Sequence, residues 1–301
     1  MKIFSNFIGQ EYYEKKLIAL KDKPITLFND YPLKSLDELI INPVNIFVVN
    51  EPNEFFGIHD WVIKNHHLFS IILTWSQKIL DNCENAALFH HGSKNIDLEY
   101  CYKFFPKGKS NDYLLVPNNQ PIFEVSFLRG ILNKIEGHHL RHRIYDLKDQ
   151  IKISNKFWDV LSDFDYKINN RPVGDALPNG NPPEGGEGKK EVWNRNSMFH
   201  IAVENSSHKN YFTDKIVDCF CTKTIPIYWG APNIGDFYDS RGIIQFQTEQ
   251  ELIELINKLT PEDYYSRLEA IENNYQWALK DSNYFKRMEN WLLNLCKENN
   301  I

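Results

Sequence analysis

One short polar segment carries the residue types best suited to ligand binding. It follows an apolar run that ends at Val203, it begins with Glu204 and Asn205, and it contains Tyr211. The apolar run is expected to be a buried strand. Because ligands of open α/β sheets bind at the carboxyl ends of strands, this loop is a candidate binding site.

The helix that follows this loop is expected to begin with Thr213 as its N-cap. Asp214 and Lys215 then occupy its first turn. Helix N-termini favour anions, so a lysine at this place opposes the helix dipole unless a bound anion such as phosphate compensates for it. The alternative is an exposed Lys215 paired with Asp214 or Glu204.

A second candidate binding segment, rich in basic residues, lies at residues 137–143, which read Gly-His-His-Leu-Arg-His-Arg. It opens a predicted helix over residues 138–150, after a predicted strand over residues 123–128. Arginine suits a diphosphate because its planar fork donates two parallel hydrogen bonds. The alternatives are a solvated basic face and a metal site. No carboxylate or cysteine accompanies the three histidines at helical spacing, which disfavours the metal site.

The elements that must position these residues alternate between short apolar runs and helical patterns, which is typical of parallel sheets flanked by helices. The predicted strands are residues 46–49, 71–74, 86–89, 123–128, 198–203, 224–228 and 242–246. The predicted helices are residues 138–150, 214–222, 250–259, one that begins at Pro261, and 284–297.

Residues 116–121 have the composition of a linker between two such α/β halves. The sequence therefore predicts an N-terminal domain over residues 1–118 and a C-terminal domain over residues 119–301. The last helix carries an apolar stripe and is expected to pack against another part of the protein.

Residues 171–190 hold five glycines and four prolines, which excludes a helix or a central strand. This segment is expected to be either a lid near a site or a disordered insertion. Just before it, Asp163 and Asp165 form a lone DxD, which by itself is a weak indication of a metal site. We expect no metal site and no metal requirement.

Composition sets the broad class. The 301 residues include 25% charged and 42% hydrophobic residues, the net charge is −6, and the five cysteines form no Cys-x-x-Cys pair. The acidic balance disfavours nucleic-acid binding. No apolar run is long enough to span a bilayer, and the first residues lack a signal peptide. We expect a soluble, cytoplasmic protein with reduced thiols.

Residues 200–235 resemble the donor-binding signature of the α-1,3-fucosyltransferases, glycosyltransferase family 10. That signature runs from a strand through Glu-Asn and Tyr-x-Thr-Glu-Lys to a helix and a strand that ends in Ile-Pro-Ile-Tyr-Trp-Gly. Here Glu204-Asn205 is followed by Tyr211-Phe-Thr-Asp-Lys215 and then by residues 225–230, which read Ile-Pro-Ile-Tyr-Trp-Gly. Asp214 departs from the usual Glu, which keeps the charge but shortens the reach by one methylene.

The resemblance implies a GT-B-like α/β fold, with two Rossmann-like doubly wound domains facing across a cleft. By analogy with such enzymes, the last helix is expected to pack back on the N-terminal domain. Because no membrane anchor is found, the resemblance also suggests a bacterial or viral enzyme and not a Golgi-type one. By position, Asn205, Tyr211, Asp214 and Lys215 would line the GDP-sugar site. Family members also carry a diphosphate-binding arginine in a strand-then-helix context, for which Arg141 aligns best and Arg143 is the fallback.

The resemblance also implies an inverting mechanism, which needs a general base for the acceptor hydroxyl. Glu51 follows the predicted strand 46–49, in a place comparable to that of the family's base. Glu54 is the second choice, and the alternative is that Glu51 only caps the following turn.

The sequence thus predicts an inverting, fucosyltransferase-like enzyme that transfers fucose from GDP-fucose to a hydroxyl of a glycan acceptor without a metal or other cofactor. One alternative is a related GT-B transferase that uses a different nucleotide sugar. The other is a non-catalytic protein that binds a nucleotide or a glycan.

Overall fold

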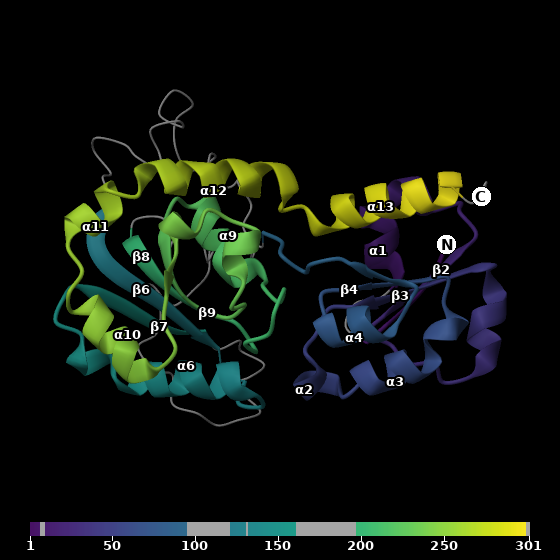
Figure 1. The fold of residues 1–301 in the computed structure, drawn as a ribbon, viewed down its shortest axis with the longest axis horizontal. Coiled ribbons are helices and arrows are strands. Elements are labelled where there is room, and N and C mark those ends of the chain that lie inside the picture. The colour runs from purple at the N-terminus through teal and green to yellow at the C-terminus, as the bar shows by residue number, and fades with distance from the viewer. Residues whose placement is uncertain (7–9, 95–120, 131, 161–196, 299–301) are drawn as a thin grey trace. The chain divides into compact units, whose positions relative to one another are not determined.

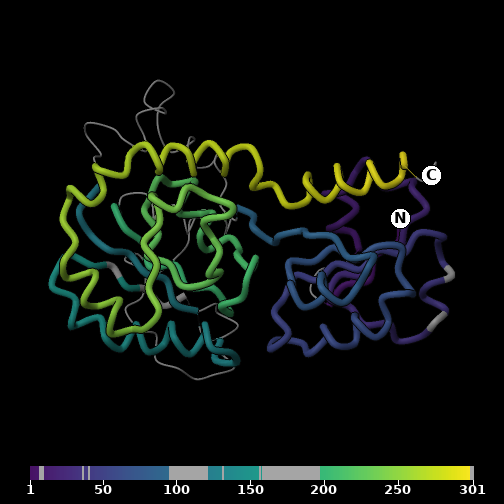
Figure 2. Tube along the Cα trace, viewed as in Figure 1, coloured from purple at the N-terminus to yellow at the C-terminus, as the bar shows by residue number. Residues whose placement is uncertain are grey.

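The computed structural model describes residues 1–6, 10–94, 121–130, 132–160 and 197–298. The chain divides into two compact units, drawn in Figures 1 and 2. The N-terminal unit comprises residues 1–92, 208–211 and 283–301, and the C-terminal unit comprises residues 93–207 and 212–282. The predicted linker at residues 116–121 and the segment 171–190 lie almost wholly outside the described residues.

The N-terminal unit is built on a parallel sheet in the order β1-β2-β3-β4-β5. Its strands are β1 (Lys2–Ser5), β2 (Ile25–Asn29), β3 (Val44–Val49), β4 (Ile71–Thr74) and β5 (Ala86–Leu88). Every residue of β2 and β3 is buried, as expected for central strands of a sheet that is covered on both faces. The sequence predicted β3, β4 and β5 and missed β1 and β2.

Helices cover both faces of this sheet (Figure 1). They are α1 (Gln10–Lys16), α2 (Asn53–Phe56), α3 (His59–Asn65), α4 (Gln77–Asn82) and α13 (Tyr284–Glu298), with 3₁₀ turns at Ile18–Leu20, Leu36–Ile41 and His66–Leu68. Helix α13 buries Tyr284, Met288, Leu292 and Cys296 in the same apolar cluster as β1, β2 and β3. The C-terminal helix is therefore part of the core of the N-terminal unit.

The C-terminal unit is built on a second parallel sheet, in the order β10-β9-β8-β6-β7. Its strands are β6 (Ile122–Gly130), β7 (Asn155–Val160), β8 (Ser197–Val203), β9 (Ile225–Trp229) and β10 (Ile244–Gln245). The sequence missed only β7, which lies at the sheet edge. The helices are α6 (Glu136–Asp146), α9 (Asp214–Cys221), α10 (Glu249–Ile256), α11 (Pro261–Tyr265) and α12 (Leu268–Asp281), with 3₁₀ turns at Lys148–Gln150, Ile234–Asp236 and Ser240–Gly242.

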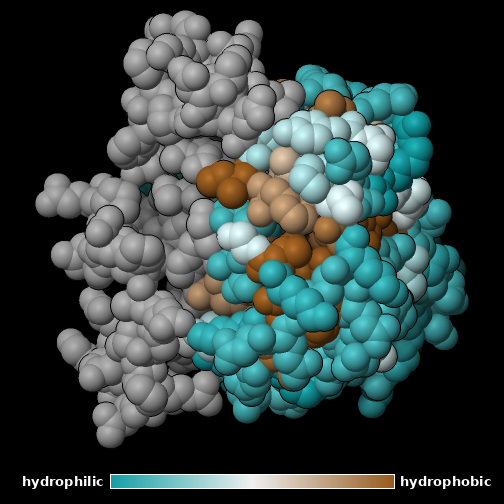
Figure 3. All heavy atoms as spheres, turned by 90° about the vertical axis from the view of Figure 1, so that its left-hand side faces the viewer, coloured by the Kyte–Doolittle hydropathy of each residue, from teal (hydrophilic) through white to brown (hydrophobic). Residues whose placement is uncertain are grey.

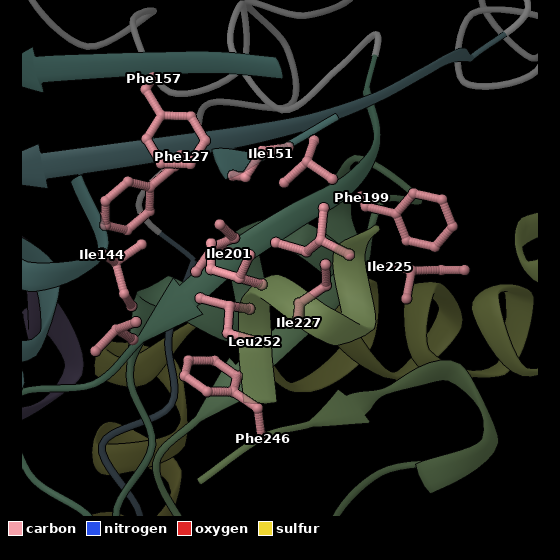
Figure 4. Packing of buried hydrophobic residues seen from close by; sticks show 14 of the residues in the cluster. Phe127, Ile144, Ile151, Phe157, Phe199, Ile201, Ile225, Ile227, Phe246 and Leu252 are labelled. Atoms are coloured by element: carbon pink, nitrogen blue, oxygen red, sulfur yellow. The ribbon is translucent and has the colours of Figure 1, made fainter. Parts of the chain in front are cut away.

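The core of the C-terminal unit forms where strand side chains meet helices. Phe127, Phe199 and Ile227 from three neighbouring strands pack with Ile144 of α6 and Leu252 of α10 (Figure 4). All five are at most 2% exposed. A core this closely packed holds the strand ends, and therefore the loops that follow them, in fixed positions.

The surface of the C-terminal unit seen in Figure 3 is mostly hydrophilic, with one band of hydrophobic side chains. Among the described residues, no helix combines the length and the apolar character needed to cross a bilayer. The four cysteines in the described ranges are buried.

Candidate functional site

The strand order of the C-terminal unit indicates where a ligand would bind. From β6 the chain continues to β7 on one side, and it then returns to β8 on the other side. The order therefore reverses between β6 and β8, and ligands of open α/β sheets bind at such a switch point, beyond the carboxyl ends of the strands. Helix α6 begins after β6 and α9 begins after β8, so both helix N-termini lie at this edge.

The start of α6 packs directly on the loop after β8. The Gly137 amide donates to the Asn205 carbonyl over 2.9 Å. A Cβ on Gly137 would lie 1.8 Å from the Glu204 carbonyl oxygen and 2.6 Å from the Asn205 carbonyl oxygen, so only glycine fits. Arg141, one turn later, donates from Nη2 to Asn205 Oδ1 over 2.7 Å and from Nε to the Gly137 carbonyl over 2.9 Å. These bonds fix the guanidinium beside Asn205.

The side chain of Glu204 holds the start of α9 in place through hydrogen bonds. Its carboxylate is fully buried and accepts the amide and the hydroxyl of Thr213, over 2.8 and 2.7 Å. Thr213 is the N-cap of α9, as the sequence predicted. Burial raises the pKa of Glu204, and the nearby Lys215 charge and the Thr213 hydrogen bonds act against that rise.

Lys215 lies above this buried carboxylate. Its Nζ is 3.7 Å from Glu204 Oε2, 3.9 Å from Asp214 Oδ1 and 3.2 Å from Thr213 Oγ1. About a quarter of its side chain is exposed. The pairing with Asp214 and Glu204 that the sequence left open is therefore present, and it holds a cation at the N-terminus of α9.

A third basic side chain, His138, is buried at the start of α6. Burial lowers the pKa of His138 to about 4, and the charges of Arg141 and Lys215 add to the effect. We call Arg141, Asn205, Asp214 and Lys215 the basic cluster. Its cations and the two helix N-termini form a place suited to an anion.

Arg143 does not join the basic cluster. Its guanidinium donates to Glu136 over 2.8 Å and to Glu249 over 2.9 Å, and both pairs are partly exposed. Arg143 thus ties α6 to α10, and of the two predicted arginines only Arg141 is bonded to the loop after β8.

Glu51 and Glu54 belong to the N-terminal unit. Glu51 is half-buried and lies just beyond β3, at the carboxyl edge of the sheet. Its amide donates to Asp30 Oδ1 over 3.4 Å, and its carbonyl oxygen lies 3.2 Å from His59 Nε2. Glu54 is partly exposed in α2 and pairs with His208 over 2.7 Å.

Tyr211 packs in the N-terminal unit. Its ring is 1% exposed and lies 4.7 Å from that of Trp75, which is also buried. His208 stacks on the same indole, with a centroid separation of 5.8 Å. Sequence proximity to Asp214 did not reveal this placement.

A close contact at Gly230 and the question of a metal site complete the description of this edge of the sheet. A Cβ on Gly230 would lie 2.2 Å from the Tyr228 hydroxyl and 2.6 Å from Glu204 Cγ, so this glycine makes room for the buried carboxylate. Within the described ranges, no three His, Cys, Asp or Glu side chains gather as metal ligands. The Asp163–Asp165 motif lies outside those ranges.

Comparison with known proteins points to one family. Residues 171–299 match the model of the glycosyltransferase family 10 (fucosyltransferase) C-terminal region. The chain is 29% identical over 111 residues to the alpha-(1,3)-fucosyltransferase FucT of Helicobacter pylori, which covers 34% of this chain and 22% of that protein. It is 37% identical over 65 residues to alpha-(1,3)-fucosyltransferase B of Drosophila melanogaster, which covers 20% and 15%.

These sequence matches span about a fifth of the curated relatives, whereas the structural matches span nearly whole chains. A crystal structure of an α1,3-fucosyltransferase aligns over 94% of this chain and 91% of its own, with a TM-score of 0.54 and 16% identity. One described as being with GDP-fucose aligns over 93% and 90%, with a TM-score of 0.52 and 15% identity. The GT-B-like α/β fold class is confirmed. The resemblance to glycosyltransferase family 10, the fucosyltransferases, is confirmed by the match over residues 171–299.

Proposed function

We propose that this chain is a fucosyltransferase that transfers fucose from GDP-fucose to a hydroxyl of a glycan acceptor, with inversion. The observation that carries the proposal is the basic cluster at the switch point of the C-terminal sheet. The family match at residues 171–299 covers Asn205, Asp214 and Lys215 of that cluster. Related structures are described as being with GDP and with GDP-fucose.

The basic cluster has the chemistry that a nucleoside diphosphate requires. As the glycosidic bond breaks, negative charge develops on the diphosphate, and fixed cations stabilise that charge without reorganising. Arg141 is fixed by its bonds to Asn205 and Gly137, and Lys215 is fixed by Thr213 and Glu204. Lys215 would neutralise the leaving GDP, and Arg141 would bind it through its planar fork.

Glu51 would accept the proton of the acceptor hydroxyl. Glu51 lies just beyond the buried strand β3 of the N-terminal unit, in a turn where its amide donates to Asp30 Oδ1. Tyr211, which packs on Trp75 in the N-terminal unit, would line the GDP-sugar site. No metal enters this proposal, so transfer should persist in excess EDTA.

Calorimetric titration with GDP, UDP and ADP tests the donor site directly. Wild type should prefer GDP. Lys215→Ala should weaken GDP binding about tenfold or more, because a hydrogen bond to a charged group contributes about 1.5–3 kcal/mol. Arg241→Ala removes a cation that is paired with Asp239 and Glu269 in the same unit, and it serves as the matched control.

The outcomes separate the candidate functions. Equal affinity for the three nucleotides would refute the GDP assignment and favour a transferase that uses another nucleotide sugar. Asp214 is consistent with that alternative, because its side chain is one methylene shorter than the Glu usual in the family. Glu51→Gln should retain GDP binding and lose transfer. Rapid transfer by this variant would refute the role of Glu51 as the base.

A further inference from the structure

Asp30 is a carboxyl that the proposed reaction leaves unused. It directly follows β2 and has a φ of 48°, a left-handed conformation that Asp tolerates better than most residues. Its amide donates to the Val48 carbonyl over 2.9 Å, and the Asn6 side chain donates to its carbonyl oxygen. The backbone at Asp30 is therefore held from both neighbouring strands.

The side chain of Asp30 reaches the turn that carries Glu51. Asp30 is 0% exposed, and its Oδ1 accepts the amides of Asn50 over 2.9 Å and Glu51 over 3.4 Å. Its Oδ2 is buried and has no hydrogen-bond partner among the described residues. One carboxylate oxygen thus fixes the backbone at the point where the chain leaves β3.

We propose that Asp30 is a positioning residue for the base Glu51, because it orients the Asn50–Glu51 turn. Its carboxyl lies beside the same turn, so the carboxyls of Asp30 and Glu51 are expected to titrate as a coupled pair. This inference rests on the proposed function, in which Glu51 accepts the acceptor proton. The covalent step itself is unchanged. The hydroxyl proton passes to Glu51, and Asp30 touches neither sugar.

The groups around Asp30 offer it no cation. Within the described part of the chain, no ion pair joins it to a lysine or an arginine, and it faces Glu51, Tyr13 of α1 and Tyr284 of α13. Burial raises the pKa of Asp30, and the charge of Glu51 raises it further. Burial also raises the pKa of both tyrosines and lowers that of His59, so these groups are neutral near pH 7.

Two carboxyls that interact in this way lose their protons in two macroscopic steps that belong to the pair. The first ionisation leaves one negative charge, and the second must overcome repulsion inside a buried turn.

Two substitutions separate the two roles. Asp30→Asn keeps an oxygen that can accept the two amides but cannot ionise, and Asp30→Ala loses both properties. Asp30→Ala should lower kcat about tenfold or more, with the KM for GDP-fucose nearly unchanged, because the base is misplaced. Asp30→Asn should recover most of this kcat. Asp22→Asn, an exposed aspartate of the same unit, is the control.

The second readout is the ¹³C NMR titration of the Glu51 carboxyl, which needs no activity. The Glu51 resonance should respond to two steps in the wild type and in Asp22→Asn, and to one step in Asp30→Asn. Identical titrations in wild type and Asp30→Asn, or an unchanged kcat in Asp30→Ala, would overturn the inference. Paired titration in a protein that transfers no fucose would instead refute the proposed function and leave the coupling in place.

Discussion

Replacing Gly137 by alanine tests whether the contact between α6 and the loop after β8 is as tight as the structure describes. The added Cβ would lie 1.8 Å from the Glu204 carbonyl oxygen, whereas ordinary contacts begin near 3.4 Å. The two backbones would have to separate by about 1.5 Å, well beyond what a packed interior absorbs without cost. That separation breaks the 2.9 Å bond from the Gly137 amide to Asn205.

The magnitude follows from these changes. Overpacking costs about 1–3 kcal/mol, and loss of a backbone hydrogen bond adds about 1 kcal/mol. The higher helix propensity of alanine returns at most about 1 kcal/mol. Gly137→Ala should therefore lower the free energy of unfolding by about 1–3 kcal/mol, measured by urea denaturation. Because Arg141 is bonded to Gly137 and Asn205, GDP affinity should also fall about tenfold.

Gly130→Ala is the matched control, since a Cβ at Gly130 would meet nothing within 4 Å. It should leave the stability within about 0.5 kcal/mol of the wild type. If Gly137→Ala were as stable as Gly130→Ala and bound GDP equally well, the argument that this close approach positions Arg141 would be refuted.

Three further predictions follow from individual contacts. His138→Gln should reduce acid destabilisation. Because the pKa of His138 is lowered in the folded state, stability that is present above about pH 6.5 is lost as the pH falls toward 4. The free energy of unfolding should therefore fall by about 2 kcal/mol less between pH 7 and pH 4.5 in this variant than in the wild type. Arg143→Ala should cost less than about 1 kcal/mol of stability, because exposed ion pairs contribute little, and its loss of GDP affinity by calorimetry should be smaller than that of Arg141→Ala; the reverse order would contradict the assignment. Tyr284→Phe should destabilise by about 1–3 kcal/mol in urea denaturation, because the buried Asn50 Oδ1 loses its 2.9 Å donor, and an unchanged midpoint would show that this bond contributes nothing.

Much of the fold could be predicted from apolar runs and turn residues. The strands β3, β4, β8 and β9 are mostly apolar segments, and burial on both faces explains their composition. Strand β7, which reads Asn-Lys-Phe-Trp-Asp-Val, was missed because an edge strand tolerates polar residues. Strand β1 has only four residues, too few for a clear period.

The candidate site was predictable where the information is local. The N-cap Thr213 and the first-turn Lys215 follow from rules that involve three or four neighbours. The distinction between Arg141 and Arg143 depends on Asn205 and Glu249, which are 64 and 106 residues away. Such distances fall outside any local pattern.

The importance of Asp30 was likewise invisible in the sequence. The residues next to Asp30 in the sequence do not indicate that its carboxyl is fully buried. The amides that donate hydrogen bonds to this carboxyl belong to residues 50 and 51, about 20 positions further along the chain. Burial of a polar group against backbone amides is a tertiary property.

The composition of the N-terminal unit has a consequence for biosynthesis. Helix α13 fills the apolar cluster beside β1, β2 and β3, yet it is translated after the whole of residues 93–282. Until it emerges from the ribosome, the nascent N-terminal sheet lacks the side chains of Met288 and Leu292, and its apolar face remains open to chaperones or to aggregation. The C-terminal unit has no such dependence beyond residue 282. We therefore expect the C-terminal unit to fold before the N-terminal unit, which is completed only after α13 has been made.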